Sequence, residues 1–278
     1  MENWRVSDEK IEDFLELSEE QAINYNFASD GEESDRSALA KEVYGKLFSF
    51  YDNDKFYKQT FEWFNTEKKG YEDLTGDTLI TWRIPIMKRY YNQAYKSLKD
   101  DKKNQIKDIL KKYAPFDGPV EFAENADKEK MQLSNYYVLG NLGLTPTWGG
   151  INSKRALCFN DCYDAFLRLL ENFYQQNGNE YINDCIVGQA ILEQKDYFES
   201  YKDISNFTNN DKVTDGNNAF NNFINVNLLQ DFTDGYDENN TYNVKKLASS
   251  ETFEEYVKES AKVINARSKR MWKELQTK

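Results

Sequence analysis

Hydrophobic side chains recur every three or four residues in several stretches of the chain, which is the period of one helix face. The clearest stretch spans 161–174, and its apolar positions are Tyr163, Phe166, Leu167, Leu170 and Phe173. Another spans 252–275, and shorter ones follow the potential helix caps Ser7 and Asp35 or Ser37. The pattern therefore predicts helices in the first 50 residues, at 161–174 and at the C-terminus.

Four shorter runs are rich in aromatic and β-branched residues, as strands are. They span 55–64, 78–84, 136–144 and 220–229, and the last of them also fits a short helix. Pro85 directly follows the second run and is expected to end it. We therefore predict a helix-rich α+β fold with a small sheet, as a single domain over residues 1–278, with an all-α fold as the alternative.

The stretch 87–113 is rich in lysine and arginine, and its pattern predicts a helix that breaks near Asp100 and Asp101. A proline and a glycine within 114–118 are expected to end this helix. Asparagine and aspartate dominate 205–243 around one apolar insert, which indicates two polar loops that flank a buried element.

The 278-residue chain has a formal net charge of -12 and a pI near 4.8, which disfavours general affinity for nucleic acids or anionic membranes. Residues 1–35 carry twelve acids and two bases, whereas residues 88–112 carry nine bases and three acids. We interpret the basic stretch as a solvated helix face, with a site for phosphate or an acidic partner as the alternative. Nucleic acid is not expected as a partner, apart from this local basic face at 88–112.

No stretch approaches the roughly 20 apolar residues that cross a bilayer. Residues 1–10 are polar and acidic, unlike a signal peptide. Cys158, Cys162 and Cys185 are few and odd in number, as in compartments where thiols stay reduced, and are interpreted as buried apolar thiols. We therefore expect a cytoplasmic protein with no membrane anchor.

The chain contains no histidine, which excludes Ser/His/Asp and Cys/His nucleophile arrangements and histidine-ligated zinc or iron. The glycines do not fit the phosphate-binding fingerprints GxxxxGKS/T or GxGxxG. Any chemistry must rest on carboxylates, arginine, lysine, tyrosine or a bound metal, and the sequence identifies no cofactor.

One polar cluster follows a glycine-rich turn at 145–152 and leads into the helix predicted at 161–174. Its candidate ligand-binding residues are Asn152, Arg155, Asp161 and Asp164, to which the last helix could add Asn265 and Arg267. Backbone amides beside a helix N-terminus and an arginine are typical of an anion site. The alternative is that Asp161 only caps the helix and Arg155 pairs with a carboxylate. Two aspartates on one helix do not predict a metal site.

Ile151, Asn152 and Arg155 precede the segment DCYDAFLRLLENFY at 161–174. This order resembles T-I-N-x-x-R-G leading into D-R-F-D-L-T-L-E-C-I-R-R-H-Y in an uncharacterised bacterial family of unknown function. The similarity extends to SDRSALAKEVYGKLFS at 34–49, NLLQDF at 227–232 and INARSKRM at 264–271. The resemblance implies a bacterial or phage origin and one continuous domain, but no activity.

The chain departs from the family pattern in two respects. The segment between Arg155 and Asp161 is shorter, and Gly45 and Phe173 stand where relatives tend to carry histidine. A family mechanism that needed those imidazoles could not operate here.

Two functions fit these observations. The first is a non-catalytic binding or regulatory protein, whose acidic N-terminal helix or basic 87–113 helix contacts a protein partner. The second is an enzyme or ligand-binding protein that holds an anionic, phosphorylated small molecule between the turn at 149–155 and Asp161, with Arg155 as clamp and Asn152 as orienting donor. We favour the first.

Overall fold

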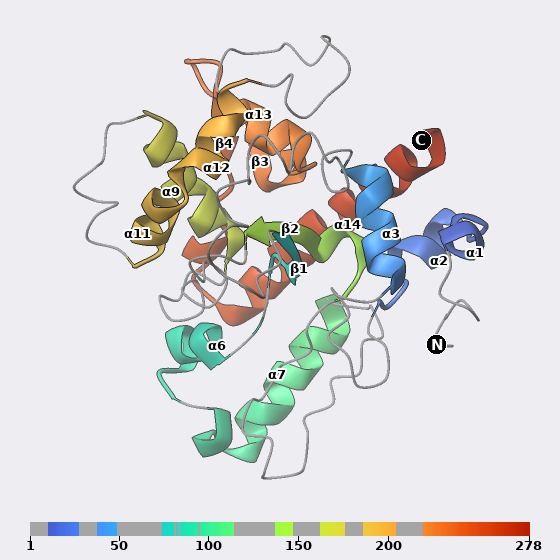
Figure 1. The fold of residues 1–278 in the computed structure, drawn as a ribbon. Helices are drawn as coiled ribbons and strands as arrows, with labels where there is room; N and C mark the ends of the chain where they lie inside the picture. The colour runs from blue at the N-terminus through green and yellow to red at the C-terminus, as the bar shows by residue number, and fades with distance from the viewer. Residues whose placement is uncertain are drawn as a thin grey trace, which may run out of the picture.

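The computed structural model describes residues 11–27, 38–48, 74–80, 82, 84–93, 95–113, 137–146, 162–175, 186–203 and 219–278. The long C-terminal helix α14 (Phe253–Thr277) runs through the middle of the described part, and the other elements pack around it (Figure 1). Helices dominate, and the described strands form two separate antiparallel pairs. The predicted helix-rich α+β class is therefore confirmed.

Helix α14 matches the helix predicted at the C-terminus. The Oγ1 of Thr252 accepts a hydrogen bond from the backbone N–H of Glu255 at 3.1 Å, which satisfies one amide of the first turn. Apolar positions such as Tyr256, Val257 and Ile264 are fully buried. Because α14 is buried along most of its length, it contacts elements from both halves of the sequence.

Among the described residues, three short helices precede the first described strand, and two of them lie against the C-terminal part of α14. They are α1 (Ile11–Leu15), α2 (Glu19–Ile23) and α3 (Ala38–Leu47). Ser18 and Gln21 form a capping box at the start of α2, in which each side chain accepts the other residue's backbone N–H. Phe14 packs edge-on against Trp272 of α14 with ring centroids 5.5 Å apart. The helix predicted after Ser7 is therefore interrupted at Ser18, and residues 1–10 lie outside the described residues.

The basic stretch forms two helices at the other end of α14. They are α6 (Ile84–Tyr91) and α7 (Asp100–Tyr113), joined through the 3₁₀ turn η2 (Tyr95–Ser97). Helix α6 ends before Asn92, whose positive φ of 50° is the left-handed conformation typical of helix ends. The predicted break is confirmed, but it lies before Asp100 and Asp101, which occupy the first turn of α7 and complement its dipole.

The first sheet joins β1 (Leu74–Thr78) to β2 (Leu142–Pro146), with Thr78 opposite Leu142. The side chain of Asn141 extends this pairing. The backbone N–H of Ile80 donates to Asn141 Oδ1 at 2.9 Å, and Asn141 Nδ2 donates to the Ile80 carbonyl at 2.8 Å. Ile80 in turn forms a β-bridge with Cys162, so the start of helix α9 (Tyr163–Gln175) is tied to this sheet.

The 3₁₀ turn η3 (Leu139–Asn141) approaches α14 more closely than a side chain would allow. The N–H of Gly140 donates to Ser268 Oγ at 2.8 Å. A Cβ at Gly140 would lie 2.0 Å from the carbonyl oxygen of Ile264. The contact between η3 and α14 therefore requires glycine at this position.

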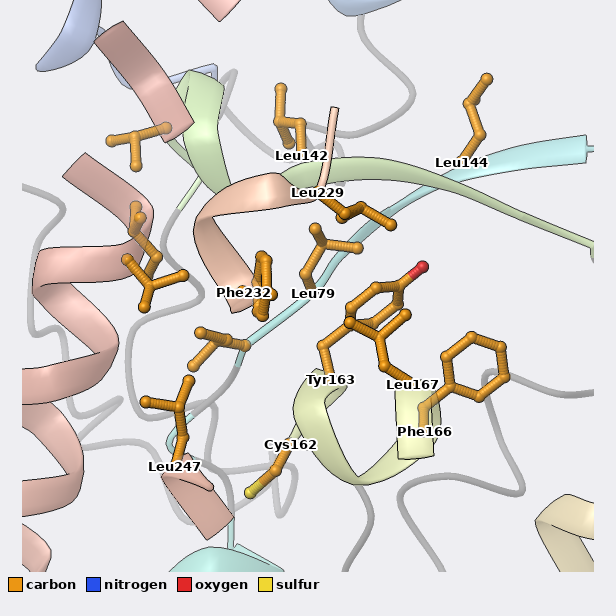
Figure 2. Close-up of a cluster of buried hydrophobic side chains, with 14 of the residues drawn as sticks. Leu79, Leu142, Leu144, Cys162, Tyr163, Phe166, Leu167, Leu229, Phe232 and Leu247 are labelled. Atoms are coloured by element: carbon orange, nitrogen blue, oxygen red, sulfur yellow. The ribbon is translucent and has the colours of Figure 1, made fainter. Parts of the chain in front are cut away.

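The remaining described helices pack with α9 on the side of α14 opposite α1 and α2 (Figure 1). They are α11 (Ile186–Glu193), α12 (Lys195–Glu199) and α13 (Ala219–Val226). The 3₁₀ turn η7 (Gln230–Phe232) leads into the hairpin of β3 (Thr233–Tyr236) and β4 (Tyr242–Val244). Figure 2 shows Tyr163 and Leu167 of α9 gathering with Leu79, Leu142 and Phe232 in the shared core.

The strand predicted at 78–84 is largely wrong, because β1 ends at Thr78 and α6 begins at Ile84. Pro85 does not end a strand but lies in the first turn of α6, where a missing N–H is tolerated.

Two further strand predictions are wrong in part, and a third falls outside the described residues. The run at 136–144 is strand only from Leu142 onward, and the run at 220–229 is mainly helix α13. Strands β3 and β4 lie in or next to the segment 205–243. The Asn- and Asp-rich composition of that segment instead predicts polar loops around its apolar insert. The run at 55–64 lies outside the described residues.

Candidate functional site

The structure describes three of the six predicted ligand-binding residues, which are Asp164, Asn265 and Arg267. Asn152, Arg155 and Asp161 lie outside the described residues. Asp164 and Arg267 are both fully buried, and no hydrogen bond or ion pair joins their side chains.

Asp164 lies in the first turn of α9 and links it to two other groups. Its Oδ2 accepts hydrogen bonds from Arg168 Nη2 at 2.8 Å and from the backbone N–H of Ala248 at 2.9 Å. Arg168 also donates to the carbonyl of Lys245 at 2.6 Å. The carboxylate therefore fixes α9 against the segment that precedes α14.

The other carboxylate oxygen of Asp164, Oδ1, is buried and has no hydrogen-bond partner among the described residues. Burial raises the pKa of Asp164, although the Ala248 N–H and the Arg168 guanidinium oppose that shift. Desolvation is the largest of these effects and outweighs the partners. Ionised Asp164 is thus less stable inside the fold than in water.

Arg267 lies on α14 with no carboxylate partner among the described residues. Its guanidinium donates to backbone carbonyls of four residues, which are Leu228 at 2.7 Å, Gly140 at 2.9 Å, Leu142 at 2.5 Å and Asn227 at 3.0 Å. Two of these carbonyls directly follow α13, where the helix dipole is negative and its last carbonyls need donors. Burial lowers the pKa of Arg267 to about 10. The side chain thus ties α14 to α13 and to the η3–β2 segment.

These contacts give both residues structural roles. Four of the five guanidinium N–H groups of Arg267 are already used. Asn265, the other candidate on α14, has a buried Oδ1 without a partner among the described residues. Participation of Asp164 or Arg267 in anion binding stays a prediction, because the turn at 149–155 lies outside the described residues.

The described residues offer no metal site, since no group of three or more Cys, Asp or Glu side chains among them could hold a metal ion. Cys162 is buried, and its thiol contacts the Tyr256 hydroxyl at 3.5 Å. Cys158 and Cys185 lie outside the described residues. None of the helices in the described ranges is long and apolar enough to cross a membrane.

An open groove of about 930 Å³ lies along the N-terminal half of α14. Helix α14 lines it with Glu255, Glu259 and Lys262, and the facing hairpin segment contributes Asp234 and Lys245. Lys262 pairs with Glu259 at 2.7 Å, and Lys245 pairs with Asp234. Because the lining holds five carboxylates and three lysines, it does not suit an anionic small molecule. The glutamate spacing on α14 was visible in the sequence, but the facing hairpin was not predicted.

Exposed bases lie along α6 and α7 and just before α7. We call Lys88, Arg89, Lys99, Lys102 and Lys111 the basic end. All five are exposed, and none forms an ion pair with another described residue. Two neighbours are paired, Lys103 with Asp100 at 3.7 Å and Lys112 with Glu254 at 3.3 Å. The interpretation of 88–112 as a solvated face fits the described part of this stretch.

A set of carboxylates lies on α1 and α2. We call Glu12, Asp13, Glu16, Glu19 and Glu20 the acidic end. Four of these side chains are exposed and Asp13 is partly exposed, and none pairs with a base among the described residues. Residues 11–27 contain no lysine or arginine, so no base within this segment neutralises its charge.

Comparison with known proteins gives no relative: no family model, no curated protein and no solved structure matches the chain. The resemblance to an uncharacterised bacterial family therefore stays a prediction.

Proposed function

We propose that this protein is a non-catalytic binding protein whose basic end docks on an acidic surface of a protein partner. The observation that carries the proposal is the set of five exposed bases that form no ion pair with another described residue. Helix α7 also exposes Asp100, Asp101 and Asp108, but bases outnumber acids nine to three over residues 88–112. Such a local excess of positive charge steers and orients a partner of the opposite sign.

The basic end is held in place by contacts on its inner side. Ile106, Ile109 and Leu110 of α7 are buried in the core. The hydroxyl of Tyr113 donates to Glu254 Oε1 at 2.7 Å, and the Tyr90 hydroxyl donates to the Ser250 carbonyl at 3.1 Å. Because the helices are already ordered, binding does not have to order the backbone that carries these bases.

The charge distribution favours a compact acidic surface over nucleic acid. Duplex DNA carries about one charge per 1.7 Å and would extend beyond the basic end. The remainder of the chain is acidic enough to give a net charge of -12, so it would repel such a polymer. A local patch of carboxylates meets only the local positive field, because charges are screened beyond about 8 Å at physiological salt.

Binding of a labelled poly-L-glutamate peptide, measured by fluorescence anisotropy at low salt, tests the proposal. Wild-type protein should bind the peptide, and K99Q/K102Q/K111Q should bind it roughly tenfold more weakly, from three exposed pairs of about 0.5 kcal/mol each. The matched control K195Q/K246Q/K273Q removes the same charge elsewhere on exposed positions and should bind more like wild type.

Equal binding of the peptide by K99Q/K102Q/K111Q and wild type would overturn the proposal, as would no binding to wild-type protein.

A thermal-shift series with inorganic phosphate, pyrophosphate and nucleotides tests the second predicted function. A ligand that favours the folded state raises the unfolding midpoint. If the same ligand raises the unfolding midpoint of K99Q/K102Q/K111Q as much as that of wild type, the result would favour an anion site near 149–164 instead.

A further inference from the structure

The basic and acidic ends are seated at opposite ends of one helix. Glu254, at the start of α14, contacts Lys112 and Tyr113 of α7. Near the end of the helix, Gln276 Nε2 donates to the Leu15 carbonyl of α1 at 3.2 Å. At 1.5 Å rise per residue, these two anchor points are about 33 Å apart along the helix axis. Figure 1 likewise shows α7 and the α1–α2 pair on different sides of the described part.

The acidic end is also held rigidly. Phe14 packs against Tyr25, Phe27 and Trp272, with ring centroids 5.3 to 5.5 Å apart. The backbone N–H of Ile11, at the start of α1, donates to Glu42 of α3 at 2.9 Å. The exposed carboxylates are therefore presented on ordered backbone, as the bases are at the other end.

The two ends cannot neutralise each other within one molecule. Their separation along α14 is several times the Debye length of about 8 Å at physiological salt. Neither end can swing toward the other while both remain packed on the same helix. Each molecule thus carries two exposed sets of opposite charge, and each set lacks an ion-pair partner among the described residues.

We infer that the acidic surface recognised by the basic end is the acidic end of a second copy of this chain. The inference rests on the proposed function and names its partner. It follows from charge complementarity. The basic end has five exposed bases, the acidic end has five carboxylates, and no described residue forms an ion pair with either set. Since every copy carries both ends, the contact closes into an antiparallel pair or extends head to tail.

Sedimentation velocity over a range of protein concentrations tests this contact. The wild-type weight-average sedimentation coefficient should rise with concentration at about 0.01 M salt, where the Debye length is about 30 Å, and not at about 1 M, where it is about 3 Å. K99Q/K102Q/K111Q and E12Q/E16Q/E20Q should each sediment as monomers. A circular dichroism melt of each variant confirms that these exposed substitutions leave the fold intact.

Mixing the two variants gives the sharpest test. One retains the acidic end and the other the basic end, so an equimolar mixture can form a single native contact and should produce one-to-one pairs. The control K195Q/K246Q/K273Q should associate as wild type does.

Monomeric wild-type protein at low salt would overturn the inference, and so would association of either end variant alone. If the wild type is monomeric yet still binds poly-L-glutamate through Lys99, Lys102 and Lys111, only the self-association fails and the proposed function stands. If that peptide binding is also absent, both fail.

Discussion

Replacing Arg267 with methionine removes a fully buried guanidinium that joins three parts of the fold. Its partners are the carbonyls of Leu228 and Asn227 after α13, and those of Gly140 and Leu142 around η3 and β2. Methionine fills a similar volume but donates no hydrogen bond. The four carbonyls would lose this donor, three of them at buried hydrogen bonds and that of Leu228 at a partly buried one.

The expected loss follows from two opposing effects. A buried polar group left without a partner costs about 1–3 kcal/mol, so four carbonyls set a scale of at least about 4 kcal/mol. Removing the charge relieves its desolvation, which is the cause of the lowered pKa of Arg267 and offsets part of this loss. We expect Arg267→Met to reduce the free energy of unfolding by on the order of 3 kcal/mol, a large share of the ~5–15 kcal/mol typical of folded proteins.

Urea unfolding followed by far-UV circular dichroism and tryptophan fluorescence measures this loss. Arg270→Met is the matched control on the same helix, since Arg270 is 43% exposed and pairs with Asp231 at 2.7 Å. That pair should contribute no more than about 1 kcal/mol. A loss below about 1 kcal/mol for Arg267→Met, or equal losses for both variants, would refute the structural role assigned to Arg267.

Three further outcomes are expected. Gly140→Ala should abolish stable folding in thermal melts, because its Cβ would lie 2.0 Å from a carbonyl of α14, whereas Gly235→Ala, with nothing within 4 Å, should lose only about 1 kcal/mol from its positive φ. Asp164→Asn should gain stability relative to wild type as the pH rises from about 4 to 7. The pKa of Asp164 is raised in the folded state, so wild type loses stability as this carboxyl group ionises, whereas asparagine does not ionise. A relative loss of stability of the variant in urea titrations would contradict this. Burial raises the pKa of Tyr197 and Tyr201, so their contribution to folding stability is present below about pH 10 and is lost as the pH rises above it. Circular dichroism should therefore show alkaline unfolding together with the rise of tyrosinate absorbance. Ionisation of these tyrosines without unfolding would disprove it.

The sequence predicted the long helices well and the short elements poorly. Helices α9 and α14 show many turns of one apolar stripe, so their period is unambiguous. The apolar run that forms α13 spans only about two helical turns, and at that length a buried strand and a buried helix look alike. Strands β3 and β4 have four and three residues, and their polar composition matched a loop.

The candidate site shows a different limit of sequence reasoning. Asp164 and Arg267 are polar residue types suited to a ligand, yet the structure gives them structural partners. Asp164 pairs with Arg168 four positions along α9 and accepts a distant backbone N–H, and Arg267 donates only to distant backbone carbonyls among the described residues. The Ala248 N–H lies 84 positions from Asp164, and the Gly140 carbonyl lies 127 positions from Arg267. Backbone donors and acceptors have no residue-type signature, so a local pattern cannot separate a buried structural charge from a binding residue.

Helix α14 connects the stability of this protein to its proposed binding. Because α7 and the α1–α2 pair are both seated on it, a variant that displaces α14 should weaken both charged ends at once. A binding defect in Arg267→Met would therefore not assign Arg267 to a binding surface. The exposed substitutions act at one end only and leave the contacts of α14 intact. Binding measured with them reports on surface charge, whereas Arg267→Met reports on the frame that holds those charges apart.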